Sequence, residues 1–520
     1  MCDVDGYTSS AILWLYIKDI YPDADLNFIV HDHKQHGLSD VINQIENDFE
    51  HYELVICPDS ASYDVEEHQI LHDMGTDCLI LDHHDQAYDD NGNPIISHVQ
   101  GTVVINNQLS PQYTNKSLCG AGVVYKFCEL LDNMLNNNLA YKYIDLVALG
   151  EIADVMDRTN VETNYLMMEG LKHIRNKGFK TLLESQSYSL KEKGSPPFDG
   201  LNTIDIAFYI APLINAITRV GTKVEKEVMF KCFVEPDALV QSTKRGAKST
   251  DFETAAEQTA RVSKNAKSRQ DRLKEKAIDN IIFKIEKEGL NNNNIILVEV
   301  DDDDEVPQEL TGLIAMAMVN KYNKPVMIGR ANSDNLVQGS IRSNSNFAGL
   351  PSFKQFLESS SYVEYVAGHD NAAGFGVYGN KIDKFIRFAN TNLKAEDFEN
   401  CYIVDYILNA KDNIQPLLNV IGGHPEYFGN HIDEVKFVIK DVPLTNVQFM
   451  GTNKDSVKIS YNGIDYVRFK DDEFAMLTTD KNNDLTVYGR VNINYFAGRY
   501  STQIFIDDYE FNVSSSKYDF

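Results

Sequence analysis

Apolar and amphipathic stretches alternate through residues 1–110. The runs LNFIV (26–30), YELVICP (52–58) and CLILD (78–82) are largely apolar, whereas SSAILWLYIKDIY (9–21) and EEHQILHDMG (66–75) repeat apolar positions at helical spacing. Apolar strands separated by helices are typical of a parallel sheet that is covered on both faces. In such a sheet the carboxyl ends of the strands form the ligand edge. We therefore expect an α/β domain whose functional residues gather at that edge.

The pattern changes three times further along the chain. After helical stretches at 121–135 and 143–156, a polar amphipathic segment without Pro or Gly runs from about Phe252 to Gly289. As one helix it would span about 54 Å, which is enough to separate two lobes. A second α/β section begins at NNIILVEV (293–300), and the last hundred residues are short alternating strands split by Gly, Asn and Asp. That last pattern predicts a small closed barrel.

These changes predict an α/β protein with four parts. The expected boundaries are a parallel-sheet domain at 1–222, a connecting segment with a long basic helix at 223–290, a second α/β domain at 291–390 and a barrel at 391–520. The length of 520 residues agrees with roughly three domains plus a connector.

Composition excludes some classes of function. The formal net charge is −29, which argues against a surface that binds a phosphate backbone over its whole extent. The segment from Lys244 to Lys276 departs from this balance, because it holds ten basic residues against five acidic ones. It is either a solvated helix face or the wall of a nucleic-acid groove.

The chain carries no pattern of an exported or membrane protein. Its seven cysteines are scattered without CxxC spacing, its apolar runs stop before about 18 residues, and no basic leader follows Met1. We therefore expect a protein of the reducing cytoplasm with no membrane span.

Candidate chemistry lies in the first domain. Asp82, His83 and His84 end an apolar run, and four further carboxylates also follow apolar or motif positions: Asp3, Asp5, Asp59 and Asp154. Aspartates that gather in one crevice without Lys or Arg repel one another, and divalent cations relieve that repulsion. Oxygen ligands with one or two imidazoles suit Mn²⁺ or Mg²⁺. Two such ions about 3.5–4 Å apart can activate a nucleophile and stabilise a displaced phosphoester oxygen.

The same segments resemble a known family. DVDG (3–6), PD (58–59), LDHH (81–84) and DLVALGEIADV (145–155) are similar to the successive motifs of the DHH phosphoesterase superfamily. APLINAITR (211–219), QGSIRS (338–343) and AGHDNAAGFGV (367–377) resemble later signatures of its RecJ branch, the single-strand-specific 5′→3′ DNA exonucleases. The resemblance implies a DHHA1-type second α/β domain and a terminal oligonucleotide-binding (OB) fold.

The resemblance also implies roles for particular residues. Asp82, His83 and His84 would be catalytic, with His84 either a ligand or a hydrogen-bonding neighbour of the scissile phosphate. Two Mn²⁺ ions, with Mg²⁺ as the alternative, would be held by Asp3, Asp5, Asp59, Asp82, His83 and Asp154.

Substrate contacts are expected from the later motifs. Ser340 and Arg342 have the donors suited to a 5′-terminal phosphate, and Gly368 and His369 would form a tight turn that approaches the substrate. In the NA motif, Asn215 and Arg219 are candidates. Arg219 is either a second phosphate contact or a salt bridge that fixes its loop.

Three features leave alternatives open. Only Met1 and Cys2 precede DVDG, where the family places an apolar strand, so either the true start lies upstream or the sheet lacks a strand and Asp3 and Asp5 are held loosely. HDHKQHG (31–37) has histidine spacing suited to a metal but favours a loop at the substrate rim. Barrel aromatics are stacking candidates or core residues: Tyr461, Tyr466, Phe469 and Tyr495.

The sequence thus predicts a monomeric, metal-dependent exonuclease that degrades single-stranded DNA 5′→3′ to 5′-mononucleotides in DNA repair, recombination or replication. Single-strand-binding protein or a helicase would be its partners, and its source would be a bacterium or a phage. Two alternatives remain: a related hydrolase of short oligonucleotides or cyclic dinucleotides, and a non-catalytic DNA-binding relative.

Overall fold

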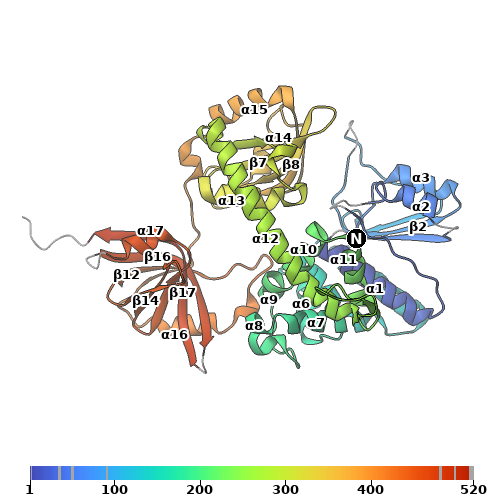
Figure 1. Ribbon diagram of the computed structural model, residues 1–520, viewed down its shortest axis with the longest axis horizontal. Coiled ribbons are helices and arrows are strands. Elements are labelled where there is room, and N and C mark those ends of the chain that lie inside the picture. Colours follow the sequence, from blue (N-terminus) through green and yellow to red (C-terminus); the bar gives the residue numbers. More distant parts are fainter. Residues whose placement is uncertain are drawn as a thin grey trace, which may run out of the picture. The chain divides into compact units, whose positions relative to one another are not determined.

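The computed structural model describes residues 1, 3–32, 37–48, 52–88, 92–479, 483–496 and 499–513. The chain forms two compact units (Figure 1), one made of Met1–Leu201 with Asp205–Cys401 and the other of Asn202–Ile204 with Tyr402–Phe520. The first unit contains both α/β lobes and the long helix between them. The second contains the C-terminal strands.

The first lobe is built on the predicted parallel sheet. Its strands are β1 (Leu54–Pro58), β2 (Asp77–Asp82) and β3 (Thr102–Asn106), in the order β1-β2-β3. Cys57 pairs with Ile80, and Asp82 pairs with Asn106, so neighbouring strands end at the same edge. Helices α2 (Ile42–Asp48) and α3 (Val65–Asp73) also belong to this lobe.

The strand expected at 26–30 is not formed, and that prediction is wrong. Residues 22–30 contain no helix or strand. Their backbone has no neighbouring strand to bond with among the described residues, because the described sheet ends at β1.

Helices surround the first core. They are α1 (Val4–Ile20), α4 (Gly120–Leu135), α5 (Ile144–Ala153), α6 (Val161–Lys172), α7 (Lys177–Ser185), α8 (Ser187–Leu190), α9 (Thr203–Tyr209), α10 (Ala211–Val220) and α11 (Lys223–Val234). Buried residues of α11, including Met229 and Phe230, belong to this core. The core therefore reaches past residue 222, while the predicted domain boundaries stay predictions.

One described segment, Thr203–Val220, is apolar and long enough by composition to be considered for a membrane span. It comprises α9 and α10, and half of it is buried inside the protein. Ile206, Ile214 and Ile217 pack into the first core, so we assign the segment to that core.

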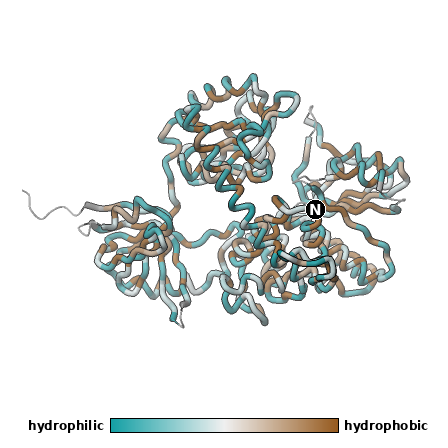
Figure 2. Tube along the Cα trace, viewed as in Figure 1, coloured by the Kyte–Doolittle hydropathy of each residue, from teal (hydrophilic) through white to brown (hydrophobic). Residues whose placement is uncertain are grey.

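The predicted long helix is α12 (Ala255–Glu288), and it spans about 51 Å. It begins after the small hairpin of β4 (Leu239–Gln241) and β5 (Phe252–Thr254) with a capping box between Thr254 and Glu257. It ends at Gly289, whose φ of 68° suits glycine. Figure 2 shows it as largely hydrophilic, yet Val262 and Ala266 pack into the first core and Ile281 and Ile285 into the second lobe.

The second lobe carries a mixed sheet with the order β6-β7-β8-β10-β9. Its strands are β6 (Ile296–Glu299), β7 (Val326–Ala331), β8 (Leu336–Arg342), β9 (Tyr365–His369) and β10 (Ala372–Tyr378). Only β6 and β7 run parallel among these pairs. Helices α13 (Thr311–Tyr322), α14 (Phe353–Glu358) and α15 (Gly379–Asn392) complete the lobe.

The second unit is a single sheet of seven described strands in the order β11-β12-β16-β17-β15-β14-β13. The strands are β11 (Tyr406–Asn409), β12 (Lys436–Pro443), β13 (Val447–Met450), β14 (Ser456–Tyr461), β15 (Ile464–Arg468), β16 (Asn483–Phe496) and β17 (Arg499–Val513), with helices α16 (Gln415–Gly422) and α17 (Asp472–Leu477). Tyr466 is fully buried and Tyr461 packs against the same core, whereas Phe469 is exposed. The fully buried Tyr466 cannot serve as a stacking platform.

Candidate metal centre

Asp82 organises the turn that follows β2. One of its oxygens accepts hydrogen bonds from the backbone N–H of His83 at 2.7 Å and from Nδ1 of His84 at 2.7 Å, and the other accepts from the N–H of Ser62 at 3.2 Å. Burial alone would raise the pKa of Asp82, but the hydrogen bond and charge of His84 outweigh it and hold that pKa well below its usual value. Conversely, burial lowers the pKa of His84, but Asp82 raises it to about 9.

His83 lies at the centre of three carboxylates. Its Nε2 is 3.2 Å from Oδ1 of Asp59, 3.6 Å from Oδ2 of Asp154 and 3.7 Å from Oδ2 of Asp5. His83 directly follows β2, Asp59 directly follows β1, Asp154 directly follows α5, and Asp5 lies in the first turn of α1. Burial lowers the pKa of His83, which favours the neutral imidazole that can ligate a metal.

Two groups of ligand atoms are close enough to hold an ion. One comprises Asp59, His83 and His84, and the other comprises Asp5, His83 and Asp154. We call these five residues the ligand cluster. Asp3 and Asp82 are not in either group among the described residues, so their predicted ligation stays a prediction.

Asp5 is fixed by the start of α4. Its carboxylate accepts hydrogen bonds from the N–H of Gly120 at 2.5 Å and of Ala121 at 2.8 Å, at the positive end of the helix dipole. A Cβ at Gly120 would lie 2.5 Å from Cβ of Asp59. Two backbone donors thus hold the carboxylate of Asp5, while the two alternatives for the strand before DVDG stay open. Asp3 caps α1 by accepting from the N–H of Gly6 at 3.1 Å.

Asp59 has an unusual backbone conformation. Its φ is 62°, in the left-handed region, and its N–H donates to the carbonyl of Leu81 at 2.8 Å. Strained backbone of this kind persists where the surroundings hold it, and it is common at functional sites. Asp154 follows α5, where its N–H donates to the carbonyl of Gly150 at 2.9 Å.

Sequence reasoning missed residues that support the cluster. Glu151 is fully buried one turn before Asp154, and burial followed by the charge of Asp5 raises its pKa well above the usual value. Asn106, at the end of β3, donates to Oγ of Ser62 and to the carbonyl of His84, both at 3.0 Å. The signal for Asn106 was its place at the end of the third strand.

The donors of this cluster fit a hard divalent cation. They are carboxylate oxygens and imidazole nitrogens, the ligands that Mn²⁺ and Mg²⁺ sites use. The neighbouring Cys119 is fully buried, and burial raises the pKa of its thiol well above the usual value. A protonated thiol is a poor ligand, so the cluster does not resemble a sulfur-rich zinc site.

Two half-buried arginines, one from each lobe, lie close enough for the charge of one to act on the other. We call Arg219, at the end of α10, and Arg342, at the end of β8, the arginine pair. Burial lowers the pKa of both guanidinium groups. At Arg219 the negative charge of Asp3 partly opposes this lowering. At Arg342 the positive charge of Arg219 lowers the pKa further. Across the described ranges, no carboxylate lies within ion-pairing distance of either arginine. The described residues therefore do not support the salt-bridge alternative for Arg219, and its role as a phosphate contact stays a prediction.

The other predicted substrate residues are Ser340, Asn215, Gly368 and His369. Ser340, two positions before Arg342 on β8, hydrogen bonds through Oγ with Oγ1 of Thr311 at 2.9 Å. Asn215 is half-buried one turn before Arg219. Gly368, with φ 127°, precedes His369 at the end of β9; His369 is exposed and is not in the ligand cluster.

The histidine-rich loop is only partly described. His33 and His36 lie outside the described residues. Nδ1 of His31 is 3.0 Å from the α-amine of Met1, and Nε2 is 2.9 Å from the carbonyl of Gly37. His31 is thus engaged in structural contacts.

Most cations of the basic segment are paired within the protein. Arg261 contacts Glu253 at 2.5 Å, Arg269 contacts Glu225 at 2.8 Å, and Lys264 donates to a backbone carbonyl. These contacts favour the interpretation of α12 as a solvated, internally compensated helix.

Comparisons with known proteins agree with this geometry. Residues 1–151 match the DHH family, N-terminal domain, and residues 404–508 match the RecJ OB domain. Over 99% of its length the chain is 36% identical to a putative SPbeta prophage-derived single-strand DNA-specific exonuclease, YorK, of Bacillus subtilis, of which it covers 87%. It is 23% identical to the single-stranded-DNA-specific exonuclease RecJ of Bacillus subtilis, of which it covers 60%.

The fold agrees as well. RecJ of Thermus thermophilus in complex with Mn²⁺ superposes with a TM-score of 0.68 at 18% identity, over 98% of this chain and 67% of that one. The chain therefore belongs to the DHH family, among its RecJ-like members.

Proposed function

We propose that this chain is a divalent-metal-dependent exonuclease that degrades single-stranded DNA from its 5′ end to 5′-mononucleotides. The observation that carries the proposal is the arginine pair, two half-buried guanidinium groups that have no carboxylate partner among the described residues. Its YorK relative is named a single-strand DNA-specific exonuclease, and RecJ structures contain Mn²⁺ or Mg²⁺.

The ligand cluster would hold the ions. Asp5, His83 and Asp154 would bind one cation, and Asp59 and His83 would contribute to a second, with Asp3 and Asp82 as the further predicted ligands. When bound, two divalent cations supply the charge that activates a water molecule and stabilises the leaving oxygen of a phosphodiester. The buried carboxylates position that charge at the end of the parallel sheet.

His84 is suited to a role in substrate binding. Asp82 accepts from Nδ1 of His84 and raises its pKa to about 9, so the imidazole stays protonated at neutral pH in the metal-free protein. An imidazolium is a hydrogen-bond donor for a phosphate oxygen. This supports the expected role beside the scissile phosphate over ligation by His84.

The arginine pair would bind the 5′-terminal phosphate. A guanidinium can donate two parallel hydrogen bonds to a phosphate, and Arg342 already donates from Nη1 to the carbonyl of Ile341 at 2.6 Å, which fixes its plane. Ser340 would add a hydroxyl donor. Because the pair lies beside Asp3, the 5′ end would be measured from the ligand cluster, and cleavage would release one nucleotide at a time.

The family resemblance also supports a proposal about the cellular process in which this activity serves. We place the enzyme in DNA repair, recombination or replication in the cytoplasm, where a helicase or a single-strand-binding protein would deliver the strand. The strand would be unpaired before it reached the ligand cluster.

The test is product analysis with end-labelled single strands in Mn²⁺. A 5′ label should be released at once as a mononucleotide, while a 3′-labelled strand should shorten gradually, and Asp82→Ala should do neither. Immediate release of a 3′ label would refute the direction. Faster hydrolysis of a dinucleotide than of a long strand would point to an oligonucleotide hydrolase, and strand binding without manganese uptake or hydrolysis would indicate a non-catalytic protein.

A further inference from the structure

The first turn of α13 packs on the face of β8 that carries the expected phosphate contacts. Ser340 and Arg342 are two positions apart on β8, so both side chains project from the same face of the sheet. Thr311, the first residue of α13, contacts Ser340. A Cβ on the next residue, Gly312, would lie 2.4 Å from Nη2 of Arg342. The start of this helix therefore adjoins both expected donors.

The hydroxyl group of Thr311 has only one proton to donate. Its Oγ1 is 2.8 Å from the backbone carbonyl of Gln308 and 2.9 Å from Oγ of Ser340. A carbonyl oxygen can only accept a hydrogen bond, so the proton of Thr311 is directed to Gln308. In the second contact Ser340 is then the donor and Oγ1 of Thr311 is the acceptor.

This arrangement engages the only proton that Ser340 could offer to a phosphate. A serine hydroxyl has one proton, and an ionised phosphate oxygen can only accept, so Ser340 binds phosphate only after its O–H turns away from Thr311. The arrival of a phosphate therefore breaks one neutral hydrogen bond. A hydrogen bond to an ionised group is roughly twice as strong as a neutral one, so the exchange still favours the phosphate.

Thr311 is held firmly enough to stay an acceptor throughout the exchange. Its side chain is buried, whereas that of Ser340 is half-buried. The backbone N–H of Thr311 also donates to the carbonyl of Gln308, which fixes the residue where α13 begins. When Ser340 turns, Oγ1 of Thr311 therefore stays in place to accept its proton again.

We propose that Thr311 is a positioning residue that weakens the hold of Ser340 on a 5′-phosphate and so speeds the release of the mononucleotide product. The inference rests on the proposed binding of the 5′-terminal phosphate by Arg342 and Ser340. Each released nucleotide carries the phosphate that was bound there, and product release limits turnover in many enzymes. Ser340 turns back to Thr311 as the nucleotide leaves, and no covalent bond changes in the exchange.

Calorimetric titration with thymidine 5′-monophosphate tests this role without any hydrolysis. Thr311→Val removes the acceptor and leaves the proton of Ser340 available, so the Kd of the nucleotide should fall about 3- to 10-fold. The Kd of thymidine, which has no phosphate, should not change. Thr311→Ser keeps the acceptor and should bind the nucleotide as the wild type does. A gain in affinity is the opposite of what the loss of a merely structural contact would cause.

Two controls show whether the effect passes through Ser340. In a Ser340→Ala background, Thr311→Val should leave the Kd of the nucleotide unchanged. Thr391, on α15 of the same lobe, also donates from Oγ1 to a backbone carbonyl, that of Arg387 at 2.8 Å. Thr391→Val should therefore bind the nucleotide as the wild type does. Circular dichroism checks the fold, and Thr311→Ala, which also removes the acceptor, replaces Thr311→Val if that variant is unfolded.

Several results would overturn the proposal. These are unchanged or weaker nucleotide binding in Thr311→Val, an equal gain for thymidine, or a gain that persists in the Ser340→Ala background. Arg342→Gln separates this inference from the proposed function, because it should weaken nucleotide binding whatever Thr311 does. Binding unchanged in Arg342→Gln, or no binding by the wild type, would refute the phosphate site itself. Weakened binding in Arg342→Gln without a gain in Thr311→Val would refute only the role of Thr311.

Discussion

Two basic regions of the molecule, α12 and the arginine pair, differ in how the fold treats their charges. On α12, Arg261 and Arg269 contact Glu253 and Glu225. Arg219 and Arg342 are half-buried, are close enough for the charge of one to lower the pKa of the other, and have no carboxylate partner among the described residues. Charges that the protein compensates itself contribute to its stability, whereas buried charges that it leaves uncompensated indicate an external ligand of opposite sign. The ligand cluster is the acidic counterpart of the arginine pair.

The largest expected effect comes from removing one charge of the ligand cluster. Asp59→Asn should reduce kcat on single-stranded DNA by about 10³-fold, or roughly 4 kcal/mol, because the amide cannot replace the anionic oxygen beside His83. Asparagine tolerates the left-handed backbone at this position, so the fold should survive. Calorimetry should show weaker Mn²⁺ binding in parallel.

Asp85→Asn is the matched control for that variant. Asp85 lies one residue after His84 and is exposed, and its backbone carbonyl, not its carboxylate, accepts from Tyr63. Both its kcat and its Mn²⁺ affinity should equal those of the wild type. An equal loss in the two variants would mean that general acidity near the turn, rather than the ligand cluster, supports hydrolysis.

Among the paired cations of α12, the ion pair between Arg261 and Glu253 can be removed by substitution. Arg261→Met should lower the free energy of unfolding by about 2–3 kcal/mol at neutral pH, because Glu253 is buried and loses its closest cation. Burial alone would raise the pKa of Glu253, but hydrogen bonds from Arg261, Gln258 and Ser242 lower it from 4.5 to about 2.

The sign of the pH dependence follows from that shift. A carboxyl group with a lowered pKa stabilises the folded state above its unfolded pKa and loses that contribution as it is protonated. The stability difference between wild type and Arg261→Met should therefore shrink as the pH falls from 4.5 towards 2. Urea unfolding of both proteins across this range would measure it, and a constant difference would show that packing, not charge, is lost.

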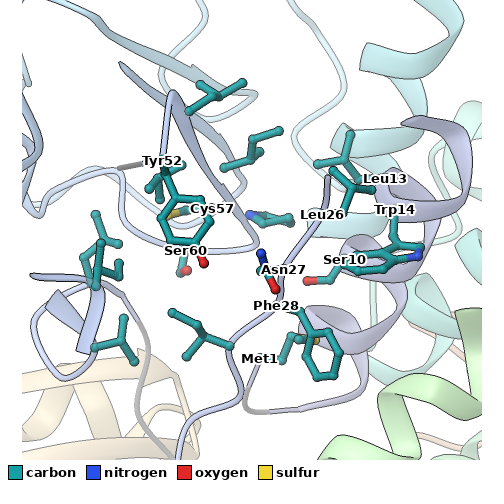
Figure 3. A pocket seen from close by; sticks show the side chains of 18 of the residues that line it. Met1, Ser10, Leu13, Trp14, Leu26, Asn27, Phe28, Tyr52, Cys57 and Ser60 are labelled. Carbon is teal, nitrogen blue, oxygen red and sulfur yellow. The ribbon is translucent and has the colours of Figure 1, made fainter. Parts of the chain in front are cut away.

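The sequence predicted elements that are defined by their own side chains. Strands β1 and β2 and helices α1, α4, α5 and α12 lie where the apolar patterns place them, because periodicity reflects which face is buried. The strand predicted at 26–30 is absent, because a strand also needs a neighbouring edge to pair with. Its apolar side chains instead line a cavity together with residues of α1 and β1 (Figure 3).

The site residues that could be predicted were also those whose own side chains carry the signal. Motifs identified the residues of the ligand cluster and the arginine pair, since their chemistry is visible in residue type and order. The buried Glu151 and the hydrogen bonds from Gly120 and Ala121 to Asp5 depend on helices packing together, which spacing does not reveal. Charge counting left the role of α12 open, because the partners of its cations lie far away in sequence or on neighbouring turns.

Arg342→Gln tests the uncompensated side of the comparison. It should slow hydrolysis of 5′-phosphorylated strands by about 10- to 100-fold, which corresponds to roughly 1.4–2.8 kcal/mol, and change hydroxyl-ended strands much less. Arg330→Gln is the matched control, because Arg330 lies in the neighbouring strand β7 and is paired with Asp302. It should leave the preference for a 5′ phosphate intact. An equal loss on both kinds of strand in Arg342→Gln would remove the role in reading the 5′ end.

The smallest expected effect compares two cations on α12 itself. Lys276 is paired with Glu305, whereas Arg272 is exposed and has no ion pair among the described residues. If DNA passes along this helix, Arg272→Gln should reduce the slope of log affinity against log salt by about 1, since it removes one phosphate contact. Lys276→Gln should change the slope much less, because its charge is already compensated. Titrations of single-stranded DNA at several salt concentrations would measure both slopes. Equal reductions in the two variants would show that the ion pair with Glu305 does not prevent Lys276 from binding phosphate.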